Sequence, residues 1–233
     1  MSTILISGAN RGLGLEFTKQ YLKDGETIIA CCRAPDGANE LQKVAEGSGG
    51  KVRVERLDVT DDASCAALAG KLKGQAIDML INNAGIIGPA MEKQTTADMD
   101  YDGFGETLSV NAMAPLRVTM ALLPNLEAGK GKVIANVSSR MGSIGDTAVS
   151  YGTAYRASKA ALNMVMKCLS IDLKDKGYTV MVMHPGWVQT DMGGSGADLT
   201  PTESVTGMRG VLAKLSTADN GKFFNYDGSN LPW

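Results

Sequence analysis

The amino-acid sequence predicts an α/β fold in which a doubly wound parallel sheet carries helices on both faces. Three observations predict it. Strand-like and helix-like segments alternate along all 233 residues, as in three-layer α/β proteins. Several strand-like segments are continuous apolar runs, which suit parallel strands that are buried on both faces. A glycine-rich turn also joins the first strand to the first helix.

The individual elements follow from these patterns in chain order. Strands are predicted at about 3–7, 27–32, 52–57, 77–81, 132–137, 179–184 and 222–225. Helices are predicted at about 12–23, 38–46, 61–72, 98–126, 155–176 and 202–215. Asp61 and Thr202 are typical helix-start residues, and Gly177 is a typical stop. Right-handed crossovers between parallel strands then restrict the topology strongly.

Two segments fit neither a strand nor a helix. The first covers 86–97, after the fourth strand, and the second covers 185–201, after the sixth. Both should leave the carboxyl ends of strands, where open α/β sheets bind ligands. The second contains four glycines, so we expect it to form a mobile lid.

Composition and charge exclude several classes of partner. The net charge is −2, with 23 Lys and Arg against 25 Asp and Glu, which argues against nucleic acid or an anionic membrane. No apolar run reaches the ~18 residues of a membrane span. No secretory pattern opens the sequence, so we expect a cytoplasmic protein. The four cysteines and the single histidine match no metal pattern, so no metal site is predicted.

The glycine-rich turn predicts a nucleotide site. It has the sequence GANRGLG from Gly8 to Gly14, directly after the first strand. Glycines let the backbone turn sharply and approach a ligand closely. The following helix N-terminus supplies free N–H groups and a partial positive charge, which together favour a pyrophosphate. The spacing is G-x-x-x-G-x-G, which differs from the G-x-G-x-x-G of long-chain dehydrogenases.

This spacing, with the motifs that follow it, resembles the short-chain dehydrogenase/reductase family. Those motifs are Asn82-Asn83-Ala84-Gly85, Asn111, Ser138-Ser139, Tyr155-Arg156-Ala157-Ser158-Lys159, and Pro185-Gly186 with Thr190. They occur in family order, and the resemblance covers essentially the whole chain. It implies a single NAD(P)-binding Rossmann domain over 1–233 that carries both the cofactor and the substrate sites. It also implies a sheet of about seven strands in the order 3-2-1-4-5-6-7.

The resemblance implies catalytic roles for Asn111, Ser139, Tyr155 and Lys159. In the family, the residue at Tyr155 exchanges a proton with the substrate oxygen, and the residue at Ser139 hydrogen-bonds that oxygen. The counterpart of Lys159 holds the nicotinamide ribose, and that of Asn111 fixes a kink and a water that links the lysine to solvent. Ser139 and Tyr155 are sixteen positions apart, more than is usual, so 140–154 is expected to be a longer substrate loop. Ser138 competes with Ser139, which is favoured.

The pairing of Tyr155 with Lys159 also has a chemical reason. Four positions apart on a helix, both side chains project from one face. A free phenol has a pKa of about 10. We expect the ammonium of Lys159, together with the positive charge of the oxidised nicotinamide, to lower the pKa of Tyr155 toward the range of efficient proton transfer.

The end of the second strand favours NADP(H) over NAD(H). Members of the family that prefer NAD place an Asp there, whereas here Cys32 leads directly into Arg33. A guanidinium suits a 2′-phosphate, and Arg11 could contact it from the other side. Asp36 could reverse the preference by reaching the ribose, and Asp58 resembles the adenine-contacting Asp of the family. The predicted cofactor residues are Gly8, Asn10, Arg11, Gly12, Leu13, Gly14, Arg33, Asp58, Val59, Asn83, Ala84, Gly85, Tyr155, Lys159, Pro185, Gly186, Val188 and Thr190.

The predicted substrate residues are Met141, Tyr151, Trp187 and Met192. Such apolar, partly deformable walls suit a small or medium hydrophobic carbonyl compound. The segment from Phe223 to Trp233 and the run SSRMGSI resemble the C-factor and sniffer-like branch, which contains carbonyl reductases. The expected function is therefore NADPH-dependent reduction of aldehydes or ketones. Alcohol oxidation and a C-factor-like signalling role with secondary catalysis are alternatives, and the resemblance leaves a homodimer or homotetramer open.

Overall fold

All seven strands lie in one parallel sheet with the order β3-β2-β1-β4-β5-β6-β7. A computed structural model describes residues 1–233. The strands are β1 (Thr3–Ser7), β2 (Thr27–Cys32), β3 (Val52–Arg56), β4 (Met79–Asn82), β5 (Val133–Val137), β6 (Thr179–His184) and β7 (Phe223–Asn225). The chain order reverses between β1 and β4, which places the switch point of the sheet there. The predicted fold class is confirmed.

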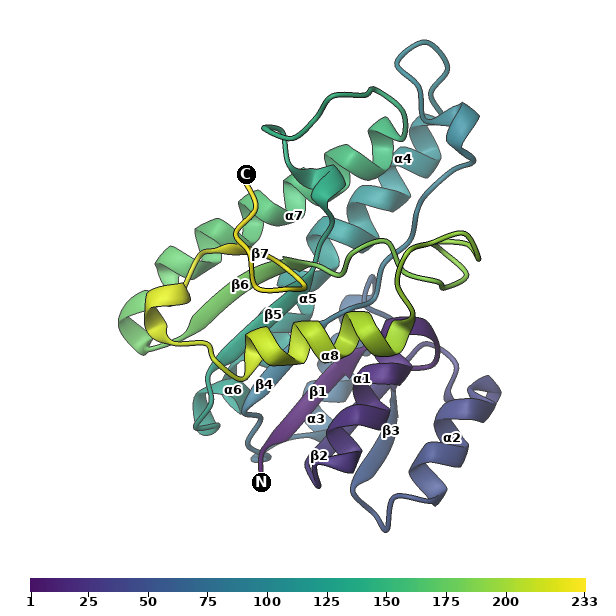
Figure 1. The fold of residues 1–233 in the computed structure, drawn as a ribbon. Coiled ribbons are helices and arrows are strands. Elements are labelled where there is room, and N and C mark those ends of the chain that lie inside the picture. The colour runs from purple at the N-terminus through teal and green to yellow at the C-terminus, as the bar shows by residue number, and fades with distance from the viewer.

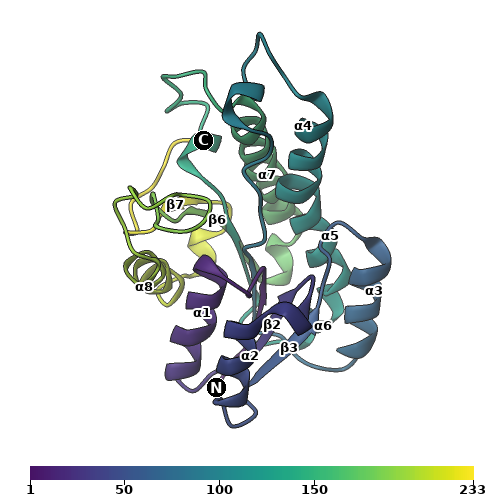
Figure 2. The same ribbon diagram turned by 90° about the vertical axis from the view of Figure 1, so that its right-hand side faces the viewer.

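Helices cover both faces of the sheet (Figure 1). One layer contains α1 (Gly12–Lys23), α2 (Asn39–Glu46) and α8 (Pro201–Leu212). The other layer contains α3 (Asp62–Lys71), α4 (Tyr101–Leu108), α5 (Ala114–Ala121), α6 (Leu123–Ala128) and α7 (Thr153–Asp172). Figure 2 shows the two layers on opposite sides of the sheet. Each layer packs its own apolar cluster against the strands, one including Phe17 and Met208, the other Leu80 and Leu162.

The segment predicted as one helix over 98–126 is instead divided into α4, a π-helical turn, α5 and α6. The π turn covers Ser109–Met113 and has Asn111 at its centre. Pro115 and Pro124 stand in the first turns of α5 and α6. Proline has no N–H to donate to a preceding turn, so it begins helices more readily than it continues them.

The helix ends agree only in part with the sequence-based expectations. Asp61 caps α3 as predicted, and its side chain accepts from the Ala63 N–H. The predicted start at Thr202 is wrong, because Thr200 and Glu203 form a capping box around Pro201. Helix α7 begins two residues earlier than predicted and ends at Asp172, before a 3₁₀ turn over Lys174–Lys176. Gly177 ends that turn with φ +79°.

Both irregular segments lie beyond the carboxyl ends of strands, as expected. The segment after β4 contains the 3₁₀ turn Met91–Lys93 and an antiparallel bridge from Gln94 to Met99. The segment after β6 is a loop whose two ends are joined by a parallel β-bridge between Val188 and Leu199. The lid function of this second loop stays a prediction. None of the helices is long and apolar enough to cross a membrane.

Candidate functional site

A cleft of about 570 Å³ opens at the carboxyl edge of the sheet. The glycine turn, the ends of β2 to β4, helix α7 and the loop after β6 all contribute to its walls. The predicted residues that line it are Gly8, Asn10, Arg11, Gly12, Leu13, Arg33, Asp58, Val59, Asn83, Ala84, Gly85, Tyr155, Lys159, Pro185, Thr190 and Met192. The fold therefore gathers at one cleft the motifs that are spread over most of the chain.

The glycine turn has the shape that a nucleotide cradle requires. Gly8 has φ +66° and Gly12 has φ +52°, a region that side chains rarely adopt. A Cβ on Gly8 would lie 2.9 Å from the Cα of Ala84, and one on Gly14 would lie 2.2 Å from the Gly8 carbonyl oxygen. Both positions exclude a side chain because the backbone packs closely there, and the turn leads directly into the N-terminus of α1. These residues fit the pyrophosphate of a dinucleotide.

Hydrogen bonds from the segment after β4 hold this turn in place. The Asn83 amide donates to the carbonyls of Ser7 (3.1 Å) and Gly8 (3.0 Å). In return, the Ser7 hydroxyl accepts from the backbone N–H groups of Asn83 (3.0 Å) and Ala84 (3.1 Å). Sequence reasoning did not identify Ser7, because its role depends on the pairing of β1 with β4.

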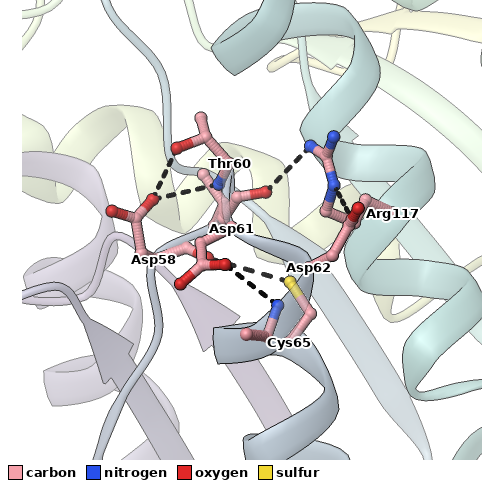
Figure 3. A network of polar contacts seen from close by, with 8 residues as sticks. Asp58, Thr60, Asp61, Asp62, Cys65 and Arg117 are labelled. Carbon is pink, nitrogen blue, oxygen red and sulfur yellow. Dashed lines mark hydrogen bonds and ion pairs between the residues drawn. The ribbon is translucent and has the colours of Figure 1, made fainter.

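The far end of the cleft is formed by the ends of β2 and β3. The carboxylate of Asp58 accepts from the hydroxyl (2.7 Å) and the N–H (3.0 Å) of Thr60. These bonds lower the pKa of Asp58, and the positive charge of Arg33 adds to the effect. Figure 3 shows Asp58 turned toward Thr60, while Arg117 approaches the same loop from α5. Arg117 donates to the carbonyl of Val59 at 3.4 Å. The loop that carries Asp58 is therefore held by hydrogen bonds within it and by Arg117 from α5.

Arg11 pairs with a residue on another wall of the cleft. Its guanidinium forms an ion pair of 2.8 Å with Asp191, in the loop after β6. Sequence reasoning did not identify Asp191, which has no motif of its own. Among the predicted cofactor residues, Gly14, Gly186 and Val188 do not line the cleft. A Cβ on Gly14 would meet the Gly8 carbonyl oxygen and one on Gly186 would meet the Leu199 side chain, and Val188 is buried.

Tyr155 and Lys159 project into the cleft from one face of α7 and are 7% and 6% exposed. Burial raises the pKa of Tyr155 to about 12, although a hydrogen bond with Ser139 opposes this. Burial lowers the pKa of Lys159 to about 8. The expected fall in the pKa of Tyr155 is therefore not found in this structure. The Lys159 ammonium lies 5.7 Å from the phenol ring centroid and donates to the Val137 carbonyl at 3.0 Å, so the loss of water around the phenol dominates.

The two adjacent serines have different partners. The Ser138 hydroxyl donates to the side-chain oxygen of Asn163 at 2.6 Å, inside the protein. The Ser139 side chain lies within hydrogen-bond reach of Tyr155 and also accepts from the Met141 N–H at 3.1 Å. Ser139 is therefore the serine placed beside the phenol, although of the two serines only Ser138 lines the cleft.

Asn111 lies behind the cleft and is completely buried. Its side-chain oxygen accepts from the Ile86 N–H (2.9 Å), and its amide donates to the Ile86 carbonyl (2.8 Å) and the Ser158 hydroxyl (3.0 Å). The predicted kink corresponds to the π turn, a feature that is frequent at functional sites. The predicted water relay to Lys159 stays a prediction.

The four predicted substrate residues are not all brought together. Met192 lines the cleft. A Cβ on Gly152, three residues before Tyr155, would lie 3.1 Å from the Met141 side chain. Tyr151 and Trp187 do not line the cleft and are 54% and 53% exposed. The Trp187 indole N–H donates within its own loop, to the carbonyl of Gly193 at 2.8 Å.

The histidine and most cysteines lie outside the cleft wall. Cys31 and Cys65 are buried, whereas Cys168 is exposed on α7. Burial, with a smaller contribution from nearby Arg140, lowers the pKa of His184 to about 4. No group of three or more His, Cys, Asp or Glu side chains is arranged to hold a metal ion.

Comparison with known proteins agrees with this geometry. Residues 2–198 match the model of the short chain dehydrogenase family. C-signal of Myxococcus xanthus is 45% identical over 157 residues, which cover 67% of this chain and 93% of that protein. Carbonyl reductase Sniffer of D. melanogaster superposes with a TM-score of 0.93 and 34% identity, over 100% of both chains. An NADPH-bound carbonyl reductase from chicken fatty liver has a TM-score of 0.92 and 38% identity, over 100% of this chain and 99% of its own. These similarities confirm the predicted resemblance to the C-factor and sniffer-like branch.

Proposed function

Because the chain belongs to the short-chain dehydrogenase family of NAD(P)-dependent oxidoreductases, we propose that it reduces small or medium hydrophobic aldehydes and ketones with NADPH. One observation carries this proposal. A buried phenol and a buried lysine, Tyr155 and Lys159, share a cleft with a glycine turn that is shaped for a pyrophosphate. The same domain would then hold the cofactor and the substrate.

The cleft residues fit NADP(H) as the cofactor. Gly8, Gly12 and the N-terminus of α1 would hold the pyrophosphate, and the absence of a side chain on Gly14 lets this turn close on itself. At the end of β2, Arg33 lines the cleft and can pair with a 2′-phosphate. When bound, NADPH supplies the hydride for the reduction. The NADPH-bound carbonyl reductase from chicken liver, with the same fold, supports this choice.

The protonation states of the buried pair suit the reductive direction. With a pKa of about 12, Tyr155 keeps its proton at neutral pH and can donate it to the oxygen of a carbonyl group. The Ser139 hydroxyl would hydrogen-bond the same oxygen and stabilise its developing negative charge. Lys159, with a pKa of about 8, is mostly charged at neutral pH and stabilises the phenolate that remains. The Val137 carbonyl holds the ammonium in this position.

The substrate class follows from the side chains near the phenol. Met192 in the cleft wall and Met141 beside the start of α7 present thioether and methylene groups. Such side chains adapt to apolar molecules of different shape. They support a hydrophobic carbonyl compound over a sugar phosphate.

Replacing Tyr155 with phenylalanine tests the reaction. The variant removes the donated proton and one hydrogen bond but keeps the ring, so NADPH affinity should stay within about twofold. Turnover with a panel of aldehydes and ketones should fall about 10²- to 10⁴-fold, the usual contribution of a general acid. Tyr178→Phe is the matched control, because Tyr178 is buried away from the cleft and its hydroxyl has no partner. Full activity of Y155F, or no NADPH consumption by the wild type with any compound, would contradict the proposal.

Replacing Arg33 with aspartate tests the cofactor. A charge-assisted hydrogen bond contributes about 1.5–3 kcal/mol, so NADPH binding should weaken about 10- to 100-fold while NADH binding is retained or gained. The affinities can be measured by titrating cofactor fluorescence. An unchanged NADPH affinity would show that another residue recognises the 2′-phosphate.

The similarity to C-signal supports a second candidate function. In that case the chain binds a cofactor as a signalling protein, and turnover is secondary. Y155F distinguishes the two functions, since a signalling protein would keep its biological effect when turnover is lost. Preferred oxidation of alcohols at cellular cofactor ratios would indicate the other alternative, a dehydrogenase.

We further propose that the protein forms a homodimer or homotetramer through the helix layer that contains α4, α5 and α7. Met113, Met120 and Met164 in this layer are exposed, and their burial between subunits would be favourable. Light scattering measures the assembly directly, and a monomeric mass at micromolar concentration would contradict it.

A further inference from the structure

The first turn of the catalytic helix α7 has no cap of its own. Its N-cap residue is Gly152, in the left-handed region with φ +71° and without a side chain. The first N–H groups of a helix have no partner within the helix. Here the Thr153 N–H donates to the backbone carbonyl of Gln94 (2.9 Å), and the Tyr155 N–H donates to its side-chain oxygen (2.9 Å). A loop residue 61 positions earlier in the chain therefore caps the turn that carries the phenol.

The other end of the Gln94 amide holds the loop that follows β4. Its nitrogen donates to the carbonyls of Ile87 (3.0 Å) and Pro89 (2.6 Å). The residue is completely buried, and both ends of its amide are hydrogen-bonded. A buried amide with good partners at each end specifies one arrangement of the segments it joins, because any other arrangement leaves polar groups unpaired.

Asn111 makes a second connection between the same two segments. It binds the backbone of Ile86 on both sides and donates to Ser158 on α7. The two buried amides thus join residues 86–89 to α7 at Tyr155 and at Ser158, one helical turn apart. Two contacts at this spacing fix the rotation of the helix as well as its distance from the cleft.

We propose that Gln94 is a positioning residue for the reaction, which holds the Tyr155 hydroxyl at its place in the cleft. The inference rests on the proposed function, in which Tyr155 is the proton donor. Gln94 itself does not line the cleft, so it acts through the backbone of α7. Catalytic groups must be held within fractions of an ångström, and a displacement of about 1 Å can reduce the rate about 100-fold.

Gln94→Met keeps the size of the side chain and removes both sets of hydrogen bonds. Its kcat for NADPH-dependent reduction should fall about 10- to 100-fold, while the Kd for NADPH stays within about twofold. Gln94→Glu keeps an oxygen for the Tyr155 N–H but places a carboxylate against the carbonyls of Ile87 and Pro89. Protonation of this carboxyl restores one donor, so kcat of Q94E should rise as the pH falls from about 8 to 5. The wild type should rise by no more than about twofold over this range, as Lys159 becomes fully charged.

Asn125→Leu is the matched control. Asn125 is also buried, and its amide donates to the carbonyls of Leu72 (2.6 Å) and Gln75 (2.8 Å). These partners precede β4, at the opposite edge of the sheet from the cleft. N125L should lower the urea midpoint of unfolding as Q94M does, but it should leave kcat unchanged.

The outcomes separate this inference from the proposed function. If turnover depends on Tyr155 while Q94M and Q94E keep the wild-type kcat and pH profile, Gln94 is only structural and the inference is wrong. If Q94M does not fold, Q94E alone decides: recovery of kcat at low pH supports positioning, and a wild-type profile overturns it. If Y155F is fully active, the proposed function and the inference both fail.

Discussion

Replacing Lys159 with methionine should make the protein more stable at neutral pH while it removes the cation that we propose takes part in catalysis. Lys159 is buried on α7, and its ammonium makes one hydrogen bond, to the Val137 carbonyl at 3.0 Å. Burial lowers its pKa from 10.5 to about 8. No carboxylate is paired with it, so the fold holds a charge that water would solvate better.

The magnitude follows from this pKa. A fall from 10.5 to about 8 corresponds to about 3 kcal/mol. Below pH 8 the lysine is charged in both states, and the full destabilisation is present. Between pH 8 and 10.5 the unfolded chain binds more protons than the folded protein, so stability rises with pH. Methionine removes this effect. It also leaves the Val137 carbonyl without a hydrogen-bond donor, which destabilises the folded protein by about 1–2 kcal/mol. K159M should therefore be about 1–2 kcal/mol more stable than the wild type at pH 7, and this advantage should be lost by pH 10.

Urea unfolding of both proteins at pH 7 and pH 10 measures the effect. Lys167→Met is the control, because Lys167 lies on the same helix, is partly exposed and donates to the Gly221 carbonyl at 3.2 Å. K167M should show no gain in stability that depends on pH. The reasoning is refuted if the difference between K159M and the wild type is the same at both pH values. It is also refuted if K159M is the less stable protein at pH 7.

Two further predictions concern the glycine turn and the histidine. Gly14→Ala places a Cβ 2.2 Å from the Gly8 carbonyl oxygen, so it should destabilise the protein by about 1–3 kcal/mol and weaken NADPH binding. Gly210→Ala, in an open position on α8, should instead stabilise it by about 0.5–1 kcal/mol; equal effects in urea unfolding would contradict the argument. Burial lowers the pKa of His184 from 6.5 to about 4. As the pH falls through this range, the imidazole takes up a proton in the unfolded chain but not in the folded protein, so the free energy of unfolding decreases. Unfolding curves of His184→Gln should lose that part of the pH dependence, and curves that match the wild type would rule out His184 as its source.

Much of this protein could be predicted from local patterns in the sequence. Continuous apolar runs indicated the parallel strands, because both faces of such strands are buried. The turn from Gly8 to Gly14 and the pair Tyr155 and Lys159 indicated a nucleotide cleft with acid–base chemistry, because residue type and spacing carry that information directly. The parallel topology of the fold then placed these motifs at one edge of the sheet, as expected.

Other features depend on contacts between residues that are distant in the sequence. Gln94 caps α7 only because the loop after β4 folds against it, and no local pattern marks such a glutamine. The long helix predicted over 98–126 is interrupted at Asn111, whose side chain binds Ile86. The proton affinities of Tyr155 and Lys159 were also decided by the tertiary structure. Spacing shows which charged groups are neighbours, whereas the loss of water that raises one pKa and lowers the other arises only when the whole chain has packed around them.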